Sequence, residues 1–377
     1  MKFTIAKELL VEAFSKVEKP VKKTSSNPIL HGFYFEITKE KLTVIGSDND
    51  VTLRYEIPVD NDQIIVEETG ITVVPPSIKE MIKKVKTELL FSLEGHNLII
   101  THGKKRKNEF KLITFNADEY PKLPILEEEK PTLQLKGNEF LSFLSKIGYA
   151  ASTSETRPVL QGICLDVKED CINLVATDSH RLGQIKLVGK NAANLRLIIP
   201  AKVIEENKKA FDLKMDVFIY CLNDRQVVFK NGDLLFYCRL LEGTYPDTSR
   251  LIPSEFTAEV KLDRKEFLDS FELVKGVSDQ ADSNSQGIVK IDIKDSVILS
   301  TFQAQTGSGK VEMEYESLEG DNEINIALSA KYMVQALKAM DDDYINFKYQ
   351  GNMRPLILEP CESQHDEVQL ILPVRSQ

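Results

Sequence analysis

Several features that would place this chain in a membrane, in an oxidising compartment or around a metal ion are missing from its sequence. No apolar run approaches the roughly 18 residues of a transmembrane helix. Lys7 and Glu8 interrupt the N-terminal segment before the apolar region of a signal peptide could form. The 5 cysteines include no CxxC pair, which favours free thiols in a reducing environment, and the 5 histidines lack the paired spacing of metal ligands. We therefore expect a cytoplasmic chain that holds no metal and no cofactor and does not enter a membrane.

The sequence also lacks a motif that would make an active site. Asp178-Ser179-His180 contains the letters of a catalytic triad, but a triad is assembled in space from separated segments. Thr306 to Lys310 resembles the end of a phosphate-binding loop. However, Ala304 stands where that motif needs glycine, and Val311 stands where it needs serine or threonine. We therefore predict no catalytic group.

What the sequence does contain is one hairpin pattern in three copies. In the middle copy, alternating apolar residues over Leu160 to Val167 and Cys171 to Thr177 flank the polar turn Lys168-Glu169-Asp170. This pattern predicts two antiparallel strands with one buried face. A glycine precedes the first strand in every copy. The three copies cover Asn27 to Ser47, Arg157 to Gly183 and Ser285 to Phe302.

Two amphipathic helix patterns accompany each hairpin and extend the repeat to about 125 residues, far longer than the roughly 20–50 residues of solenoid repeats. The first helices are expected over Ala6–Lys19, Lys136–Gly148 and Asp263–Gly276, and the second over Pro75–Lys86, Pro200–Phe211 and Ser329–Met340. Each copy is long enough to bury a core of its own. We predict an α+β chain of three tandem domains, each with two helices and antiparallel sheet, over residues 1–127, 128–253 and 254–377.

Positive charge is concentrated on one repeated element of an acidic chain. The formal net charge is −10, but the three second helices together carry nine lysines and three glutamates. The three first helices carry eight basic and eight acidic residues, so the remainder of the chain must carry −16. For any single helix a solvated, lysine-rich face is the simplest explanation, but recurrence in three copies favours one basic surface. Such a surface on an acidic body suits the phosphate backbone of a nucleic acid.

Five short motifs spread along the chain resemble those of the bacterial DNA sliding clamps, the β subunits of DNA polymerase III holoenzyme. The motifs are RPVLQG, ATDSHRLG, YPDTSRLIP, MRPLILEP and the terminal ILPVR. Each is weak alone, and their order, spacing and combination with the triplication make the resemblance specific. It implies a non-catalytic subunit of a DNA-directed DNA polymerase (nucleotidyltransferase) holoenzyme. In that family two subunits join head to tail into a ring whose helices surround duplex DNA, and the ring acts as a processivity factor.

The resemblance implies contacts to double-stranded DNA through its phosphates, without sequence preference. Lys22 and Lys23 match a family position that touches DNA. The other candidates are lysines of the second helices: Lys83, Lys84, Lys208, Lys209 and Lys338. The run Lys104-Lys105-Arg106-Lys107 is a further basic loop, and the sequence leaves open whether it is a solvated turn or has a DNA or interface role.

The family also has a groove that takes a short peptide from its partners, which are the polymerase III catalytic subunit, the clamp loader, repair polymerases and mismatch-repair proteins. Aliphatic and methionine side chains would receive apolar anchors there, and arginine at the rim would fix orientation. The matched residues are Leu160, Thr177, Ser179, His180, Arg181, Leu182, Pro246, Arg250, Leu251, Met353, Leu372, Pro373, Val374 and Arg375. The resemblance also implies that Ser329 and Tyr332 border the groove. Ordinary core is the alternative for Leu160, Leu182 and Leu251.

The last residues of the sequence are unusually apolar for a free terminus, since they read Leu-Ile-Leu-Pro-Val-Arg before Ser376 and Gln377. A terminus normally frays unless it is tied down. We therefore expect this tail to be docked, and in the family it docks as one wall of the groove.

Ring closure as a homodimer needs one free sheet edge in the first domain and another in the third. Phe110 and Leu112 are the candidates in the first domain, and Leu273 and Val277 in the third. Two alternative functions remain. One is an accessory clamp that serves repair or a specialised polymerase. The other is a triplicated enzyme with a site between domains, which a convergent acid–base cluster would support.

Overall fold

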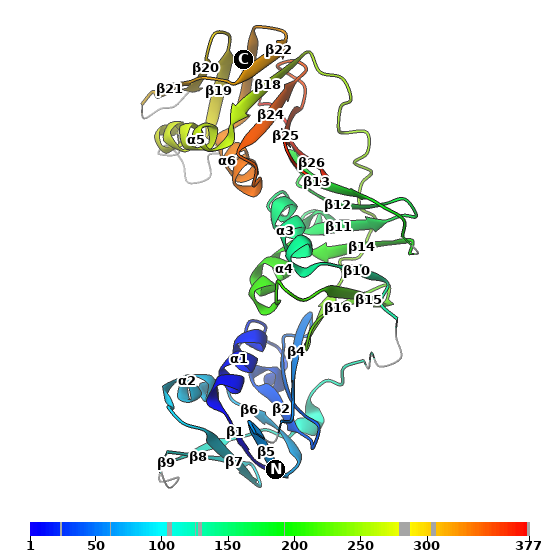
Figure 1. Cartoon of the computed structure of the whole chain (residues 1–377), viewed down its shortest axis with the longest axis vertical. Helices are drawn as coiled ribbons and strands as arrows, with labels where there is room; N and C mark the ends of the chain where they lie inside the picture. Colours follow the sequence, from blue (N-terminus) through cyan, green and yellow to red (C-terminus); the bar gives the residue numbers. More distant parts are fainter. Residues whose placement is uncertain are drawn as a thin grey trace. The chain divides into compact units, whose positions relative to one another are not determined.

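The computed structural model describes residues 1–22, 25–60, 62–103, 108–124, 126, 130–191, 193–278, 287–302 and 307–374. Within them the same order of elements occurs three times (Figure 1). Each copy has a strand, a first helix, three hairpin strands, a connection of one or two strands, a second helix and three closing strands. The predicted α+β fold with three two-helix copies is confirmed.

The first copy comprises β1 (Lys2–Ile5), α1 (Lys7–Val17), β2 (Phe33–Ile37), β3 (Lys41–Ser47), β4 (Val51–Pro58), β5 (Ile64–Glu68), β6 (Gly70–Val74), α2 (Ser77–Lys84), β7 (Leu89–Glu94), β8 (Asn97–His102) and β9 (Asn108–Ile113). The second comprises β10 (Leu133–Leu135), α3 (Gly137–Gly148), β11 (Gly162–Val167), β12 (Cys171–Thr177), β13 (Arg181–Val188), β14 (Leu195–Pro200), α4 (Ala201–Asn207), β15 (Val217–Asn223), β16 (Gln226–Asn231) and β17 (Leu234–Arg239). The third comprises β18 (Ala258–Asp263), α5 (Arg264–Ser278), β19 (Ile288–Ile293), β20 (Val297–Thr301), β21 (Lys310–Met313), β22 (Ser317–Gly320), β23 (Ile324–Ser329), α6 (Ala330–Ala339), β24 (Tyr344–Tyr349), β25 (Leu356–Pro360) and β26 (Asp366–Ile371). Short 3-10 turns precede β2 and β11 at η1 (Pro28–His31) and η4 (Pro158–Gln161), and two more are η3 (Ala117–Glu119) and η5 (Lys208–Ala210).

Local sequence explains these elements. Along β19, Val289, Ile291 and Ile293 are buried while the residues between them are partly exposed, as the period of two along a strand requires. Helix α6 is capped by Ser329, the residue before it, whose hydroxyl accepts a hydrogen bond from the backbone N–H of Tyr332 at 3.3 Å. The buried face of α6 is lined by Ala330, Met333, Val334, Ala336 and Leu337.

One pairing rule joins the copies. Strand β4, the third hairpin strand of the first copy, pairs antiparallel with β17, the last strand of the second copy. Strand β13 of the second copy pairs in the same way with β26, the last strand of the third. The resulting strand orders are β10-β15-β16-β17-β4-β3-β2-β6 and β14-β11-β12-β13-β26-β25-β24-β18-β22, beside the shorter sheets β5-β1-β7-β8-β9 and β21-β20-β19-β23. The remaining last strand is β9 in the first copy, and the remaining third hairpin strand is β21 in the third copy. Within the described residues, each of them ends a sheet and has no partner from another copy.

Because of these shared sheets, the compact units do not coincide with the copies. One unit contains residues 1–141 and 206–240, and the other contains residues 142–205 and 241–377. The middle copy is thereby divided between the two units. The two boundaries between the three predicted domains stay a prediction from the sequence.

Each unit has its own aromatic core. In the first unit Phe3 stacks on Phe91 with ring centroids 4.9 Å apart, and Phe14 packs edge-on against Phe33. In the second unit Phe267 lies edge-on to Phe271 at 5.0 Å. These side chains are fully buried. Burial of a phenylalanine side chain contributes about 1.5–3 kcal/mol, so these clusters are a principal source of stability in each unit.

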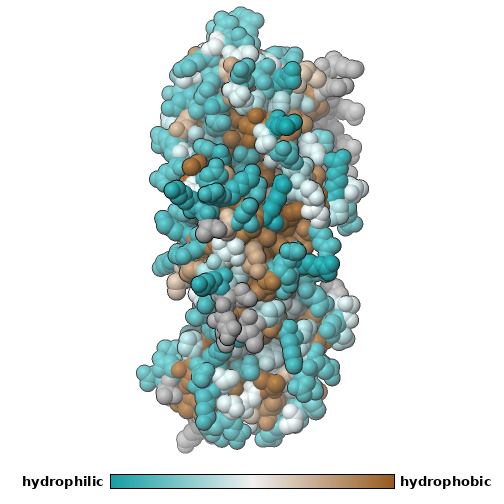
Figure 2. Space-filling model, turned by 90° about the vertical axis from the view of Figure 1, so that its right-hand side faces the viewer, coloured by the Kyte–Doolittle hydropathy of each residue, from teal (hydrophilic) through white to brown (hydrophobic). Residues whose placement is uncertain are grey.

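On the face that Figure 2 shows, hydrophilic side chains predominate and hydrophobic ones gather in separate groups. Across the part of the chain that the structure describes, no helix combines the length and apolar character needed to cross a membrane.

Candidate functional site

The turn between β12 and β13 is the centre of the predicted groove. Asp178 Oδ1 accepts hydrogen bonds from the backbone N–H groups of His180 and Arg181 at 2.9 and 3.1 Å. The Thr177 hydroxyl donates to the Arg181 carbonyl at 2.6 Å. Ser179 is held at a φ of 79°, a left-handed conformation that residues other than glycine rarely adopt. The turn is therefore rigid, and it keeps Ser179 and His180 exposed.

Arg181 has a different environment from the one expected of a rim residue. Only 7% of its side chain is exposed, and its Nε donates to Asp178 Oδ2 at 2.9 Å. Its guanidinium lies between the rings of Tyr332 and Tyr149, 4.4 and 5.1 Å from their centroids, and also donates to Gln335. Paired and stacked in this way, Arg181 holds the turn against α6 instead of offering its charge to a ligand at the surface.

The C-terminal tail is docked against this turn. The backbone N–H of Leu372 donates to the His180 carbonyl at 2.9 Å, and that of Val374 donates to the carbonyl of Ala327 on β23 at 2.8 Å. Leu372 remains 37% exposed beside the exposed His180. The expected docking of the apolar tail is therefore present, whereas Arg375 lies outside the described residues.

Apolar side chains form the floor beside the turn. Leu160, Leu182 and Tyr245 are buried in one cluster, and Val159 and Leu241 pack against it while remaining partly exposed. The Tyr245 hydroxyl accepts the backbone N–H of Thr177 at 3.0 Å, and burial raises the Tyr245 pKa above its ordinary value, so the phenol is neutral at ordinary pH. The remaining predicted residues are exposed on loops: Pro246, Arg250, Leu251 and Met353.

Three residues at this place were not singled out from the sequence. Val159 and Leu241 provide partly exposed apolar surface. Arg157 donates from Nη1 to Ser179 Oγ at 3.0 Å and so lies at the edge of the same turn. Arg157 and Val159 belong to the motif RPVLQG, which marked the place, but its letters alone do not show which side chains face solvent.

The predicted DNA-binding lysines lie on or beside the helices and are partly exposed to exposed. Lys83 and Lys84 end α2, Lys208 and Lys209 begin η5, and Lys338 is in the last turn of α6. Lys22 follows α1, and its ammonium is 3.6 Å from the Glu206 carboxylate. Lys23 and the basic run Lys104–Lys107 lie outside the described residues.

Two of the four predicted dimer residues lie on a free edge strand, and the other two lie on a helix beside the second free edge. On β9, Phe110 is 41% exposed and Leu112 is half-buried, and Ile113 at the end of the strand is 74% exposed. Leu273 and Val277 lie on α5, which packs on β20 and β21. Leu273 is 66% exposed and Val277 is half-buried. The third-domain candidates therefore lie on the helix that flanks the edge strand.

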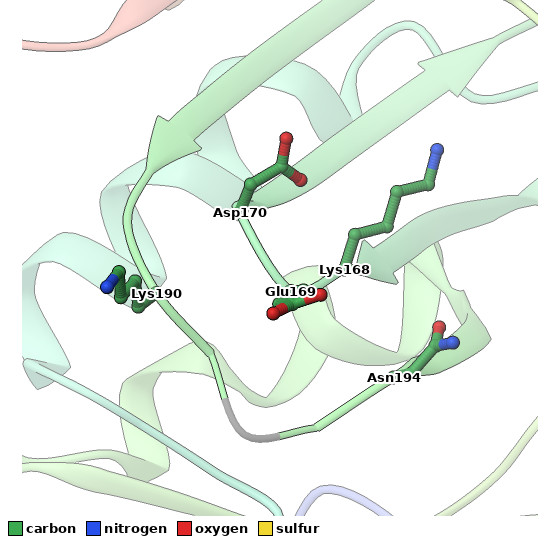
Figure 3. Close-up of a pocket in the computed structure, with 5 residues that line it drawn as sticks. All are labelled: Lys168, Glu169, Asp170, Lys190 and Asn194. Atoms are coloured by element: carbon green, nitrogen blue, oxygen red, sulfur yellow. The ribbon is translucent and has the colours of Figure 1, made fainter.

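A separate pocket shows no catalytic arrangement. Its volume is about 580 Å³, and it lies between the β11–β12 turn and the loop after β13. Figure 3 shows that its side chains do not converge on one point. The lining residues are Lys168, Glu169, Asp170, Lys190 and Asn194. Among the residues that the structure describes, no group of three or more His, Cys, Asp or Glu side chains could hold a metal ion. Of the phosphate-loop-like stretch, Ala304 and Thr306 lie outside these residues.

Comparison with family models covers nearly the whole chain. The N-terminal domain of the DNA polymerase III beta subunit matches residues 1–124, the central domain matches residues 134–247, and the C-terminal domain matches residues 249–375. These matches occur in the same order as the three copies.

Comparison with individual proteins gives the same result. The beta sliding clamps of Staphylococcus aureus (strain Mu50 / ATCC 700699) and Bacillus subtilis (strain 168) are each 33% identical to this chain, over 100% of both chains. The crystal structure of the DNA polymerase sliding clamp from Bacillus subtilis has a TM-score of 0.92 at 33% identity. That of the beta subunit from Streptococcus pyogenes has a TM-score of 0.93 at 26% identity, and both cover 100% of each chain.

Proposed function

This chain belongs to the family of bacterial DNA polymerase III beta subunits, the beta sliding clamps, and on that basis we propose how its surfaces hold DNA and partner proteins. Its function is that of a DNA sliding clamp, a processivity factor of DNA polymerase III. The alternative of an accessory clamp is not favoured. We propose that it is a non-catalytic subunit of the holoenzyme and that it works in the cytoplasm.

The pairing rule between the copies supports a ring. Each junction within the chain joins a third hairpin strand to a last strand, as β4 joins β17 and β13 joins β26. Among the described residues, the two strands of these kinds that remain without such a partner are β21, a third hairpin strand, and β9, a last strand. Two copies of the chain can therefore repeat the same junction twice, with β21 of one copy beside β9 of the other. This observation carries the proposal of a head-to-tail dimer of about 85 kDa, twice the 42.7 kDa chain.

Apolar side chains at these edges would strengthen the junction. Phe110 and Leu112 on β9, with Leu273 and Val277 on α5, would be covered when the edges pair. An exposed edge strand with large apolar side chains is a liability for a monomer, and the dimer removes it. Closure is therefore favoured by both backbone hydrogen bonds and apolar burial.

The helices would face duplex DNA. Exposed lysines at the ends of α2 and α6 and along η5 offer ammonium groups to phosphates, and such contacts carry no sequence information. A closed ring stays on DNA by topology, so these contacts need not be tight. The proposed set is Lys22, Lys23, Lys83, Lys84, Lys208, Lys209 and Lys338.

The groove beside the β12–β13 turn would take an extended peptide from the polymerase. Leu372 offers an exposed aliphatic wall, and the floor over Leu160 and Leu182 offers apolar surface through Val159 and Leu241. Ser179 and His180 supply polar groups at the rim. This combination of a few apolar anchors with polar edges is typical of peptide hot spots. We propose the same groove for the clamp loader, repair polymerases and mismatch-repair proteins.

A topological experiment tests this function. The protein is loaded by a clamp loader onto a nicked circular duplex, and the circle is then cut once at a distant site. A sliding ring should remain on the circle through gel filtration and leave the linear product within the same interval. A protein that binds DNA side-on should show the same retention on both, and that result would contradict the ring.

A further inference from the structure

Several of the proposed DNA-binding lysines already have a carboxylate partner within the protein. Lys338 on α6 lies 2.6 Å from Glu272 on α5, and both side chains are about half exposed. Lys22 lies 3.6 Å from Glu206 of α4. Lys83 lies 3.5 Å from Glu80 on its own helix. These ammonium groups face an anion before any DNA is present.

Other lysines of the same set are different. Lys84 and Lys209 are exposed, and neither has an ion pair with any residue that the structure describes. The proposed set therefore contains two kinds of lysine, one kind held by a carboxylate and the other open to a ligand.

The bridges between helices occupy different positions in different copies. In the first copy Lys79, the third residue of α2, pairs with Glu18 directly after α1. In the third copy Lys338, the ninth residue of α6, pairs with Glu272 within α5. A contact inherited with the repeat would join equivalent positions in both copies. A lysine–glutamate bridge between first and second helix has therefore arisen from unrelated positions.

Simple electrostatics gives these carboxylates an effect on DNA. A lysine binds duplex largely because its phosphate contact releases condensed counterions. A lysine already neutralised by a fixed carboxylate must share or leave that partner first, and the carboxylate also repels the phosphate. Ion pairs between exposed side chains contribute little to folding, so stability alone does not explain them.

We propose that Glu272 and Glu80 act as internal substitutes for DNA phosphate. By pairing with lysines of the helices, these carboxylates lower the affinity of the clamp for the duplex. This inference rests on the proposed function, in which these helices face DNA. Lys84 and Lys209 then provide the principal phosphate contacts, and the paired lysines provide weak, transient ones. A surface of this kind keeps the barrier to sliding low while the ring remains closed.

The test compares two variants with the same change in net charge. Glu272→Gln releases Lys338 on α6, and Glu323→Gln releases Lys294, whose pair has a length of 2.9 Å and joins the residue after β19 to the residue before β23. The dimeric proteins are titrated onto a fluorescent 30-base-pair duplex by anisotropy over a series of sodium chloride concentrations. Glu272→Gln should steepen the slope of log affinity against log salt by about one unit for each lysine that newly binds a phosphate. Its affinity at low salt should rise several-fold, and its diffusion along a stretched, end-blocked duplex should slow.

Two further variants distinguish a failure of this inference from a failure of the proposed DNA surface. Glu323→Gln should match the native protein, and equal slopes for Glu272→Gln and Glu323→Gln would overturn the inference. Lys84→Ala combined with Lys209→Ala should lower the slope by about one unit for each phosphate that is no longer bound. If that double variant lowers the slope while Glu272→Gln leaves it unchanged, only this inference fails. If neither has an effect, the helices do not face DNA and the proposed DNA surface fails as well.

Discussion

Removal of the C-terminal tail from Leu372 onward should weaken peptide binding while leaving the ring intact. The tail is held by two backbone hydrogen bonds, from Leu372 to His180 and from Val374 to Ala327. The deletion removes an apolar wall of the groove, but neither free sheet edge nor the lysine-bearing helices include these residues. The deletion should therefore lower the affinity for the peptide and leave assembly and DNA binding unchanged.

The exposed part of the Leu372 side chain determines how much peptide-binding free energy its removal should cost. A fully buried leucine side chain contributes about 1.5–3 kcal/mol, so covering the 37% of Leu372 that is exposed contributes about 0.6–1.1 kcal/mol. Leu372→Ala alone should weaken a peptide by about threefold to sixfold. The half-buried Pro373 and Val374 add further contacts, and the full deletion should cost at least about 1.4 kcal/mol, or tenfold in Kd.

Calorimetric titration with a polymerase-derived peptide that carries aliphatic and aromatic anchors measures this directly. Leu213→Ala is the matched control, because Leu213 is an exposed leucine of the other compact unit, far from these residues in the sequence. Sedimentation and retention on circular DNA should be unchanged in all three variants. Equal affinities of the intact and truncated proteins would place the partner site elsewhere.

Three further predictions concern assembly, DNA and the strained turn. Leu273→Asp combined with Val277→Asp should give folded monomers by sedimentation, because a buried unpaired charge costs several kcal/mol. A native chain that sediments as a stable monomer would contradict the ring. Replacement of Lys83, Lys84, Lys208 and Lys209 by Glu should shorten retention on a nicked circle and lower its salt dependence by about one unit for each phosphate that the variant no longer binds. Unchanged retention would make these lysines only a solvated face. Ser179→Gly should raise the free energy of unfolding by roughly 0.5–1 kcal/mol in denaturant, because glycine adopts a φ of 79° without strain. The matched variant Asn49→Gly, at a φ of 83°, should gain less since asparagine tolerates this conformation, and the opposite order would refute the strain argument.

Features that depend on local periodicity could be predicted from the sequence. The alternation of apolar residues predicted the strands β11 and β12, amphipathic patterns predicted the second helices, and a count of charges located the lysines on those helices. The tripled pattern predicted the number of copies for the same reason. Burial on one face leaves a period in the sequence whatever the rest of the chain does.

Features that depend on distant partners could not be predicted in this way. From the sequence, Arg181 is expected at the surface. Its burial depends on Tyr149 and Tyr332, which lie far away in the sequence. The ion pair between Lys338 and Glu272 could not be predicted for the same reason, because its partners are 66 residues apart in the sequence. Strands β5 and β22 were also not singled out, because they are short edge strands with little apolar alternation.

The sheet shared between copies has a consequence for how this chain can be divided. Consider an isolated middle copy, cut at residues 128 and 253. Its strand β17 would lose its partner β4, and its strand β13 would lose its partner β26. It would then present two long unpaired edges at once, which favours aggregation over folding. Either end copy would expose only one new edge. Each compact unit combines one end copy with a part of the middle copy, so the sequence repeat is a poor guide to the smallest piece that folds.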